Sequence, residues 1–246
     1  EIKNQVEIQL THITRNNQET FVNLPNLLHL ILNKIEEHRQ NPGITGLATG
    51  FYDLDRLIGG LQSSQLYILA ARTSMGKSSY GLQIAQFIAN AQNHHAVIIF
   101  SLEMSKEQLI YRLLSSISRI NSSKIRQGDL SQAEFGRLLD VANNLSQLPL
   151  YIDDSSSLGT EEIKNRCLQL LQTSPIQLIV IDYLQLIRLK QGKVENRQQE
   201  VSQVVDNLKA LAKELQVPIL ALCQLNRSIE SRHPAIPQLS DLRESG

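Results

Sequence analysis

Residues 66–90 read LYILAARTSMGKSSYGLQIAQFIAN: an apolar run, a short turn rich in Gly and Ser, and then a helical pattern. The run at 66–70 has the length and composition of a short buried strand. The tripeptide Gly-Lys-Ser at 76–78 matches the end of the phosphate-loop motif G-x-x-x-x-G-K-[ST], although Ala71 replaces the first glycine of that motif. The order of strand, glycine loop and helix therefore predicts a phosphate-binding site.

The residues of this loop suit the phosphates of a nucleotide. Backbone N–H groups at the start of a helix point toward phosphate oxygens, and Gly76 permits close approach. The ammonium of Lys77 can neutralise the β- and γ-phosphates, while the hydroxyl of Ser78 can ligate Mg²⁺. A lone Gly-Lys-Ser tripeptide also occurs at ordinary surface helices, but the preceding strand and a downstream carboxylate favour nucleotide binding. The neighbouring residues expected to contact the nucleotide are Ser74, Met75 and Ser79.

Strands and helices alternate through the rest of the chain. The apolar runs that predict strands lie at 66–70, 96–100, 148–152, 177–182 and 218–223. Helices are predicted at 77–90, 105–120, 131–147, from Thr160 onward, and along an apolar stripe from Val201 to Leu215. Two of them open with capping boxes, Ser105 with Gln108 and Ser131 with Glu134. This alternation predicts an α/β fold in which a mainly parallel sheet carries helices on both faces.

Two carboxylates follow predicted strands. Asp182 ends the run at 177–182, where burying a carboxylate is costly unless it is paired or metal-bound. In a phosphate-loop protein this position completes the Mg²⁺ shell begun by Ser78; an ordinary strand-end aspartate is the alternative. Glu103 follows the strand at 96–100, where a glutamate can polarise a water that attacks the γ-phosphate. Without the phosphate loop, a simple helix-start charge would explain Glu103 equally well.

Two neutral amides, Gln224 and Asn226, follow the last predicted strand. An amide at this place can hydrogen-bond the γ-phosphate and report its loss to the loop that follows. Ordinary capping of the strand end is the alternative, and spacing alone does not decide between them.

Composition sets broad limits on partners and compartment. The chain has 24 basic and 24 acidic residues and no net charge, so any nucleic-acid contact must come from a local patch. Cys167 and Cys223 lie in apolar contexts without a metal-ligand pattern, which predicts buried free thiols in a reducing compartment. No stretch reads as a membrane span or a signal peptide. We expect a protein of the bacterial cytoplasm or the plastid stroma, without a membrane partner.

The N-terminal part differs from the rest. Residues 1 to about 20 are polar and lack periodicity, whereas apolar residues from Leu24 to Ile35 keep helical spacing. Asn41-Pro42-Gly43 ends this amphipathic helix. We therefore divide the chain into a linker region at 1–42 and a main domain at 43–246. The helix could pack on its own domain or dock on a neighbouring subunit, and the sequence leaves both open.

A series of motifs resembles the C-terminal ATPase domain of replicative helicases of the DnaB type. In chain order they are TGFYDLDRLIGGL at 49–61, ARTSMGKS at 71–78, FSLEMS at 100–105, IDYLQ at 181–185, QLNR at 224–227 and DLRESG at 241–246. Their order and spacing are specific, and the resemblance covers most of the chain. It implies a RecA-like phosphate-loop fold, Mg²⁺-dependent ATP hydrolysis at subunit interfaces, a homohexameric ring and 5′-to-3′ translocation on single-stranded DNA.

The resemblance also implies roles for particular residues. It makes Lys77 the phosphate residue, Ser78 and Asp182 the magnesium residues, Glu103 the catalytic glutamate and Gln224 the γ-phosphate sensor. The further residues that it assigns are Arg112 at the nucleotide and Arg243, Glu244 and Gly246 at the DNA backbone. It implies a primase and a helicase loader as partners and relates the predicted N-terminal helix to the region that joins the family's N-terminal domain to the motor.

Departures from the family pattern limit the expected activity. Thr73 stands where relatives commonly have proline, which removes no ligand. The N-terminal collar domain, the basic finger of the C-terminal part and the final strands do not appear, so we expect this chain by itself to be a weak or inactive ATPase. Since the chain opens at Glu1 and closes at Gly246 inside a motif that inteins interrupt in some relatives, we expect a fragment that precedes an intein, or one cut at that point.

Basic residues after two strands are candidates for DNA contact. They are Lys190, Lys193, Arg197, Arg227 and Arg232. Contacts of such residues with backbone phosphates would be independent of base sequence and sensitive to salt; ordinary solvated charges are the alternative. With no tryptophan and only 4% aromatic residues, extensive base stacking is not expected.

Two other functions fit part of the sequence. A RecA-like recombination or repair ATPase would share the phosphate loop, Glu103 and Asp182, but the FSLEM and QLNR stretches argue against it. A nucleotide-binding interaction module such as a helicase loader would bind ATP without hydrolysing it.

Overall fold

The computed structural model describes residues 23–40, 43–91, 94–188 and 197–242, and it divides into two compact units, Glu1–Thr45 and Gly46–Gly246. The described part of the first unit consists mainly of helix α2, Leu24–Gln40. This confirms the helix predicted from the apolar spacing. None of its residues is buried, and its exposed apolar side chains include Leu24, Leu28, Ile31 and Ile35.

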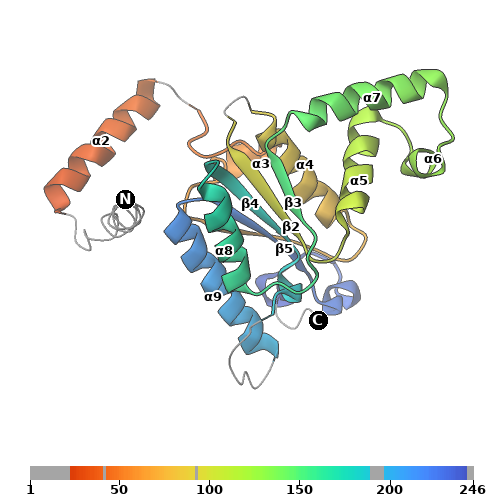
Figure 1. The fold of residues 1–246 in the computed structure, drawn as a ribbon. Helices are drawn as coiled ribbons and strands as arrows, with labels where there is room; N and C mark the ends of the chain where they lie inside the picture. The colour runs from red at the N-terminus through yellow and green to blue at the C-terminus, as the bar shows by residue number, and fades with distance from the viewer. Residues whose placement is uncertain (1–22, 41–42, 92–93, 189–196, 243–246) are drawn as a thin grey trace, which may run out of the picture. The chain divides into compact units, whose positions relative to one another are not determined.

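The second unit is built on one parallel sheet (Figure 1). Its strands are β1 (Leu66–Ala71), β2 (Ala96–Ser101), β3 (Leu150–Asp153), β4 (Ile176–Asp182) and β5 (Ile219–Gln224), in the order β1-β5-β4-β2-β3. Each predicted apolar run became a strand, with ends shifted by at most two residues. Every strand pairing is parallel, so the carboxyl ends of all five strands lie at one edge.

Helices cover both faces of the sheet, as the alternating pattern predicts. Helices α4 (Lys77–Ala89) and α5 (Lys106–Ser118) pack on one face, over strand residues such as Val97 and Val180. Helices α8 (Thr160–Leu171) and α9 (Arg197–Leu215) pack on the other, over Ile98 and Ile181. Because neighbouring residues of a strand face opposite sides, strands buried on both faces read as continuous apolar runs.

Other predictions from local sequence are also confirmed. Capping boxes join Ser105 to Gln108 at α5 and Ser131 to Glu134 at α7, Gln132–Ser146. The Ser131 backbone N–H and the Lys124 ammonium lower the pKa of Glu134 to about 2. Both cysteines are free and buried, and burial raises the pKa of the Cys167 thiol to about 12.

Two short helices were not predicted: α3, Tyr52–Ile58, and α6, Ser122–Gln127. With 7 and 6 residues, neither is long enough to show a helical period. Bonds to the residues just before it hold α3 in place: buried Asp55 accepts hydrogen bonds from the backbone N–H of Thr49 at 2.8 Å and from its hydroxyl at 2.7 Å.

Candidate functional site

The predicted site residues meet at the carboxyl edge of the sheet. Ala71, the last residue of β1, lies beside Gln224 on β5, and Asp182 on β4 lies beside Ser101 on β2. The phosphate loop and Glu103 follow directly from Ala71 and Ser101. Ligands of open parallel sheets bind in the crevice outside this edge, so the topology brings the separate motifs to one place.

The phosphate loop turns sharply between β1 and α4. Gly76 is the N-terminal cap of α4 and has φ = +87°, and Ser74 also has a positive φ of 64°. A Cβ on Gly76 would meet nothing within 4 Å, so backbone conformation rather than lack of space requires glycine here. The turn leads straight into α4, whose first N–H groups have no partner within the helix and are available to an anion.

Beneath this loop, Lys77 and Asp182 are held together out of solvent. Lys77 Nζ lies 3.7 Å from Asp182 Oδ1, and their side chains are 11% and 4% exposed. The same ammonium lies 3.9 Å from the centre of the Tyr183 ring, a favourable cation–π position. The pairing offsets the cost of burying the carboxylate.

The environment of Asp182 fits a bound Mg²⁺ ion. Among the described residues, its buried Oδ1 atom accepts no hydrogen bond, which leaves an oxygen ligand available. In the described ranges, no group of three or more His, Cys, Asp or Glu side chains is arranged so that it could hold a metal ion. Mg²⁺ suits this arrangement, because it is usually held by one or two carboxylates together with substrate phosphates and water. Asp182 and the hydroxyl of Ser78 are the side chains that would hold it.

Most of the predicted nucleotide residues line one cavity of about 410 Å³. Its lining residues are Ala71, Arg72, Thr73, Ser74, Gly76, Lys77, Ser78, Glu103, Met104, Gln108, Arg112, Arg126 and Gln224. Met75, by contrast, is 75% exposed and does not line the cavity. Ser79 lines an adjacent cavity of about 240 Å³, to which Arg112 also contributes.

Sequence reasoning missed several lining residues, among them Gln108 and Arg126. Gln108 was interpreted only as half of a capping box, and Arg126 stands on the unpredicted helix α6. The Arg126 guanidinium lies 5.8 Å from the centre of the Tyr111 ring on α5. Gln108 had a usable signal, because it lies five residues after Glu103, in the first turn of the helix that follows. Arg126 had none, since only the packing of α6 on α5 brings it to the cavity.

The sensor candidate Gln224 is held by a second glutamine. Gln185, in the turn after Asp182, accepts the backbone N–H of Gln224 at 3.3 Å and donates to its carbonyl at 3.0 Å. It also donates to Cys223 Sγ at 3.1 Å. The structure thus separates the two amides left undecided by spacing: Gln224 lines the cavity, whereas Asn226 caps the next turn through a bond from Ser228 N at 3.0 Å.

In the complete protein, we expect replacement of Gln185 by leucine to lower both stability and ATP turnover. It would leave two main-chain groups of Gln224 without partners, at a cost of about 1–3 kcal/mol, and it would release the sensor. Gln177→Leu is the matched control: Gln177 is 6% exposed against 7% for Gln185, and it donates to the His95 carbonyl at the opposite sheet edge. Both variants should unfold at a lower temperature than the wild type, whereas kcat should fall only in Gln185→Leu. Equal kcat in the two variants would contradict the positioning role of Gln185.

The segment after β5 is tied to the phosphate loop by Arg72. Its guanidinium donates to the Leu225 carbonyl and to Glu230, each at 2.7 Å. Farther on, Arg232 donates to both carboxylate oxygens of buried Asp241, at 2.9 and 2.8 Å. The structure gives Arg232 a partner within the protein, and its candidacy for DNA contact stays a prediction.

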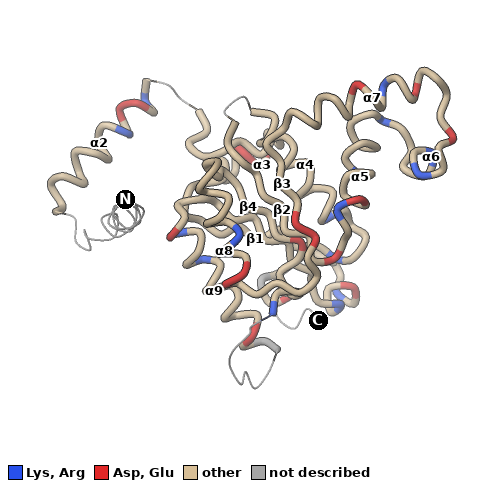
Figure 2. The backbone as a smooth tube through the Cα atoms, viewed as in Figure 1, with Lys and Arg blue, Asp and Glu red and all other residues tan. Residues whose placement is uncertain are grey.

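The other DNA candidates are only partly visible. Arg227 is exposed, as expected for a contact residue. Lys190, Lys193, Arg243, Glu244 and Gly246 and the side chain of Arg197 lie outside the described residues. In the view of Figure 2, Lys and Arg are spread over several helices and loops, in keeping with the absence of net charge.

Comparison with known proteins agrees with the motifs and the fold described above. Residues 46–246 match the family described as DnaB-like helicase C terminal domain. The chain is 45% identical over 233 residues to the replicative DNA helicase DnaB of Geobacillus stearothermophilus, which covers 94% of this chain and 51% of the relative. The chain spans about half the length, or less, of the curated relatives it matches.

Two solved structures are similar in fold at 33% sequence identity. One, described as an ATPase domain, superposes with a TM-score of 0.85, over 92% of this chain and 79% of that one. The other, a DnaB-like replicative helicase described together with its interactions with primase, superposes with a TM-score of 0.81 over 92% and 54% of the two chains. Both neighbours support the predicted α/β architecture.

Proposed function

The chain belongs to the DnaB-like helicase C-terminal domain family, and from this premise we propose that it is the motor of a replicative DNA helicase. The motor hydrolyses ATP with Mg²⁺, moves 5′-to-3′ along single-stranded DNA and unwinds the duplex at the fork. The observation that carries the proposal is the common cavity of the phosphate loop, Glu103 and Gln224, with Asp182 beneath Lys77. A nucleoside triphosphate, a metal ion and an attacking water would each find suitable groups at this site.

Several groups at this site have separate roles in the proposed phosphoryl transfer. The α4 N-terminus and Lys77 hold the β- and γ-phosphates, and they stabilise the charge that builds up on them. Ser78 and Asp182 would hold Mg²⁺, which would neutralise charge on the phosphates when bound. Glu103 accepts a hydrogen bond from the attacking water and orients it. Gln224 contacts the γ-phosphate, so departure of that phosphate changes the position of the segment after β5.

Partners are proposed from the same family relation. Single-stranded DNA would pass Arg243, Glu244 and Gly246, six chains would form the ring, and a primase and a helicase loader would bind it. The exposed apolar residues of α2 support subunit contacts, because a free amphipathic helix gains stability by covering that face. A primase interaction is described for one structural neighbour.

The proposed compartment is the bacterial cytoplasm or the plastid stroma. Among the described helices, none is both long and apolar enough to cross a membrane. The buried free thiols agree with a reducing compartment.

The recombination ATPase is the less favoured alternative, because the relatives are replicative helicases.

The complete protein is expected to unwind a forked duplex with a 5′ single-stranded tail, in a reaction that requires ATP and Mg²⁺. Single-stranded DNA should stimulate its ATPase activity, and added salt should reduce that stimulation. The control substrate carries only a 3′ tail and should stay paired. Strand exchange without unwinding would support recombination, and ATP binding without hydrolysis would support a loader.

A further inference from the structure

Glu103 stands in a short connection, residues 102–105, that must hold an exposed carboxylate steady. The front of the connection is fixed to the sheet: Leu102 donates its N–H to the Asp182 carbonyl at 2.7 Å. Ser101, only 1% exposed, closes the turn by donating its hydroxyl to the Met104 carbonyl at 2.7 Å. These bonds fix the position of the Glu103 backbone on its β2 side.

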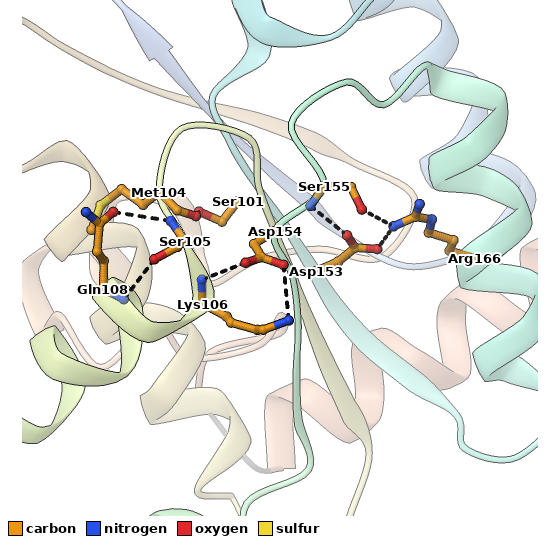
Figure 3. Close-up of polar contacts among 9 residues, drawn as sticks. All are labelled: Ser101, Met104, Ser105, Lys106, Gln108, Asp153, Asp154, Ser155 and Arg166. Carbon is orange, nitrogen blue, oxygen red and sulfur yellow. Dashed lines mark hydrogen bonds and ion pairs between the residues drawn. The ribbon is translucent and has the colours of Figure 1, made fainter.

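The back of the connection is fixed by a different strand. Helix α5 begins at Lys106, and Asp154 accepts the Lys106 backbone N–H at 3.1 Å (Figure 3). The Lys106 ammonium lies 3.6 Å from the other carboxylate oxygen. Asp154 directly follows β3, the neighbour of β2. The connection is therefore held between β4 at one end and β3 at the other.

We propose that Asp154 is a positioning residue for ATP hydrolysis, which acts by fixing the connection that carries Glu103. This inference rests on the proposed function. A helix N-terminus favours an anion, and the Lys106 backbone N–H lowers the pKa of Asp154, so its carboxylate is charged at neutral pH. The main-chain bond should matter more than the ion pair, because Lys106 is an exposed side chain and exposed pairs contribute little.

The effect should fall on turnover rather than on nucleotide binding. Arg112, the cavity residue farther along α5, lies one position from Leu113, and Leu109 and Leu113 are buried in the core. Loss of the Asp154 bond therefore loosens the first turn of α5 and Glu103 while the Arg112 end stays packed. The phosphate loop makes no described bond with Asp154.

The chain provides a matched control in the adjacent carboxylate. Asp153 accepts hydrogen bonds from Arg166 and from the backbone N–H of Ser155, and it makes no described bond to the Glu103 connection (Figure 3). Burial opposes its ionisation, but the Arg166 and Ser155 hydrogen bonds hold its pKa below the usual value. Asp153→Ala removes an anchored carboxylate at the same strand end without releasing the connection.

The test measures kcat and KM for ATP in the complete protein, with radiolabelled ATP so that slow variants can be followed. Asp154→Ala should lower kcat about tenfold, the size expected for one hydrogen bond to a charged group, with KM and the Kd of a fluorescent ATP analogue unchanged. Asp154→Asn keeps an acceptor oxygen and should restore most of kcat. Lys106→Ala keeps the main-chain N–H, and Asp153→Ala spares the connection, so both should match the wild type in kcat.

A double variant shows whether Asp154 acts through Glu103. Glu103→Gln combined with Asp154→Ala should be no slower than Glu103→Gln alone, because the residue that Asp154 positions is already gone. A further tenfold loss in the double variant, a raised KM with unchanged kcat, or an equal loss in Asp153→Ala would overturn the inference. If Glu103→Gln is slow and Asp154→Ala has wild-type kcat, only the role of Asp154 fails. If Glu103→Gln itself turns over normally, the proposed function and this inference both fail.

Discussion

Replacing Glu103 by glutamine is expected to lower ATP turnover in the complete protein by roughly 10²–10⁴-fold, the contribution of a positioned general base. Glutamine keeps the size of the side chain but accepts no proton. The phosphate loop and Lys77 are unchanged, so the Kd for ATP should stay close to the wild-type value. Steady-state hydrolysis and binding of a fluorescent ATP analogue measure the two quantities separately.

A neighbouring glutamate provides the control for charge. Glu107 lies in the first turn of α5, four residues after Glu103, but it is exposed and does not line the cavity. Glu107→Gln should hydrolyse ATP at the wild-type rate. If the two variants lost the same activity, the general field of the helix start would explain the effect, and Glu103 would lose its assigned role.

The second large effect is expected for Lys77→Ala. This change removes the ammonium at the phosphates and should lower kcat/KM by at least about 10²–10³-fold, as for the loss of one preorganised charge donor. Unlike Glu103→Gln, it should also weaken ATP binding. It further leaves the buried carboxylate of Asp182 without its cation, so thermal unfolding without nucleotide should occur at a lower temperature.

Lys164→Ala is the control for loss of a paired lysine. Lys164 on α8 pairs with Glu214 at 2.8 Å on the opposite face of the sheet from α4. Its removal should leave ATP binding and turnover unchanged. Normal ATP binding by Lys77→Ala would contradict the assignment of the phosphate loop as the nucleotide site.

The sheet could be predicted because burial on both faces makes its strands continuous apolar runs, as in Val97–Phe100 and Leu178–Ile181. The short helices could not, because α3 is stabilised by the buried Asp55 bonds to Thr49, and such a contact has no period along the chain. The order of the strands in the sheet could not be predicted from the apolar runs either, since the pairing of β5 between β1 and β4 depends on packing of the whole domain.

The same division applies to the site. Lys77, Ser78, Glu103 and Gln224 could be predicted because each lies at or shortly after the end of a strand and has a chemistry suited to phosphate, and all four line the cavity. Their supporting residues were not recognisable. Gln185 and Asp154 are ordinary polar residues in the sequence, and only the folded chain shows which main-chain groups they bind. The Asp241 partner of Arg232 was likewise not recognisable, since only the folded chain brings the two side chains together.

The pairing of Lys77 with Asp182 and Tyr183 has a consequence for the thermodynamics of nucleotide binding. A free lysine side chain loses up to roughly 2 kcal/mol of rotamer entropy when it becomes fixed. Here the ammonium is already confined between a carboxylate and an aromatic ring before any phosphate arrives. That ordering cost is met when the protein folds, so ATP binding exchanges one partner of the lysine for another instead of immobilising a mobile chain. Calorimetry of ATP binding to wild type and Tyr183→Leu would show this as a less favourable binding entropy in the variant.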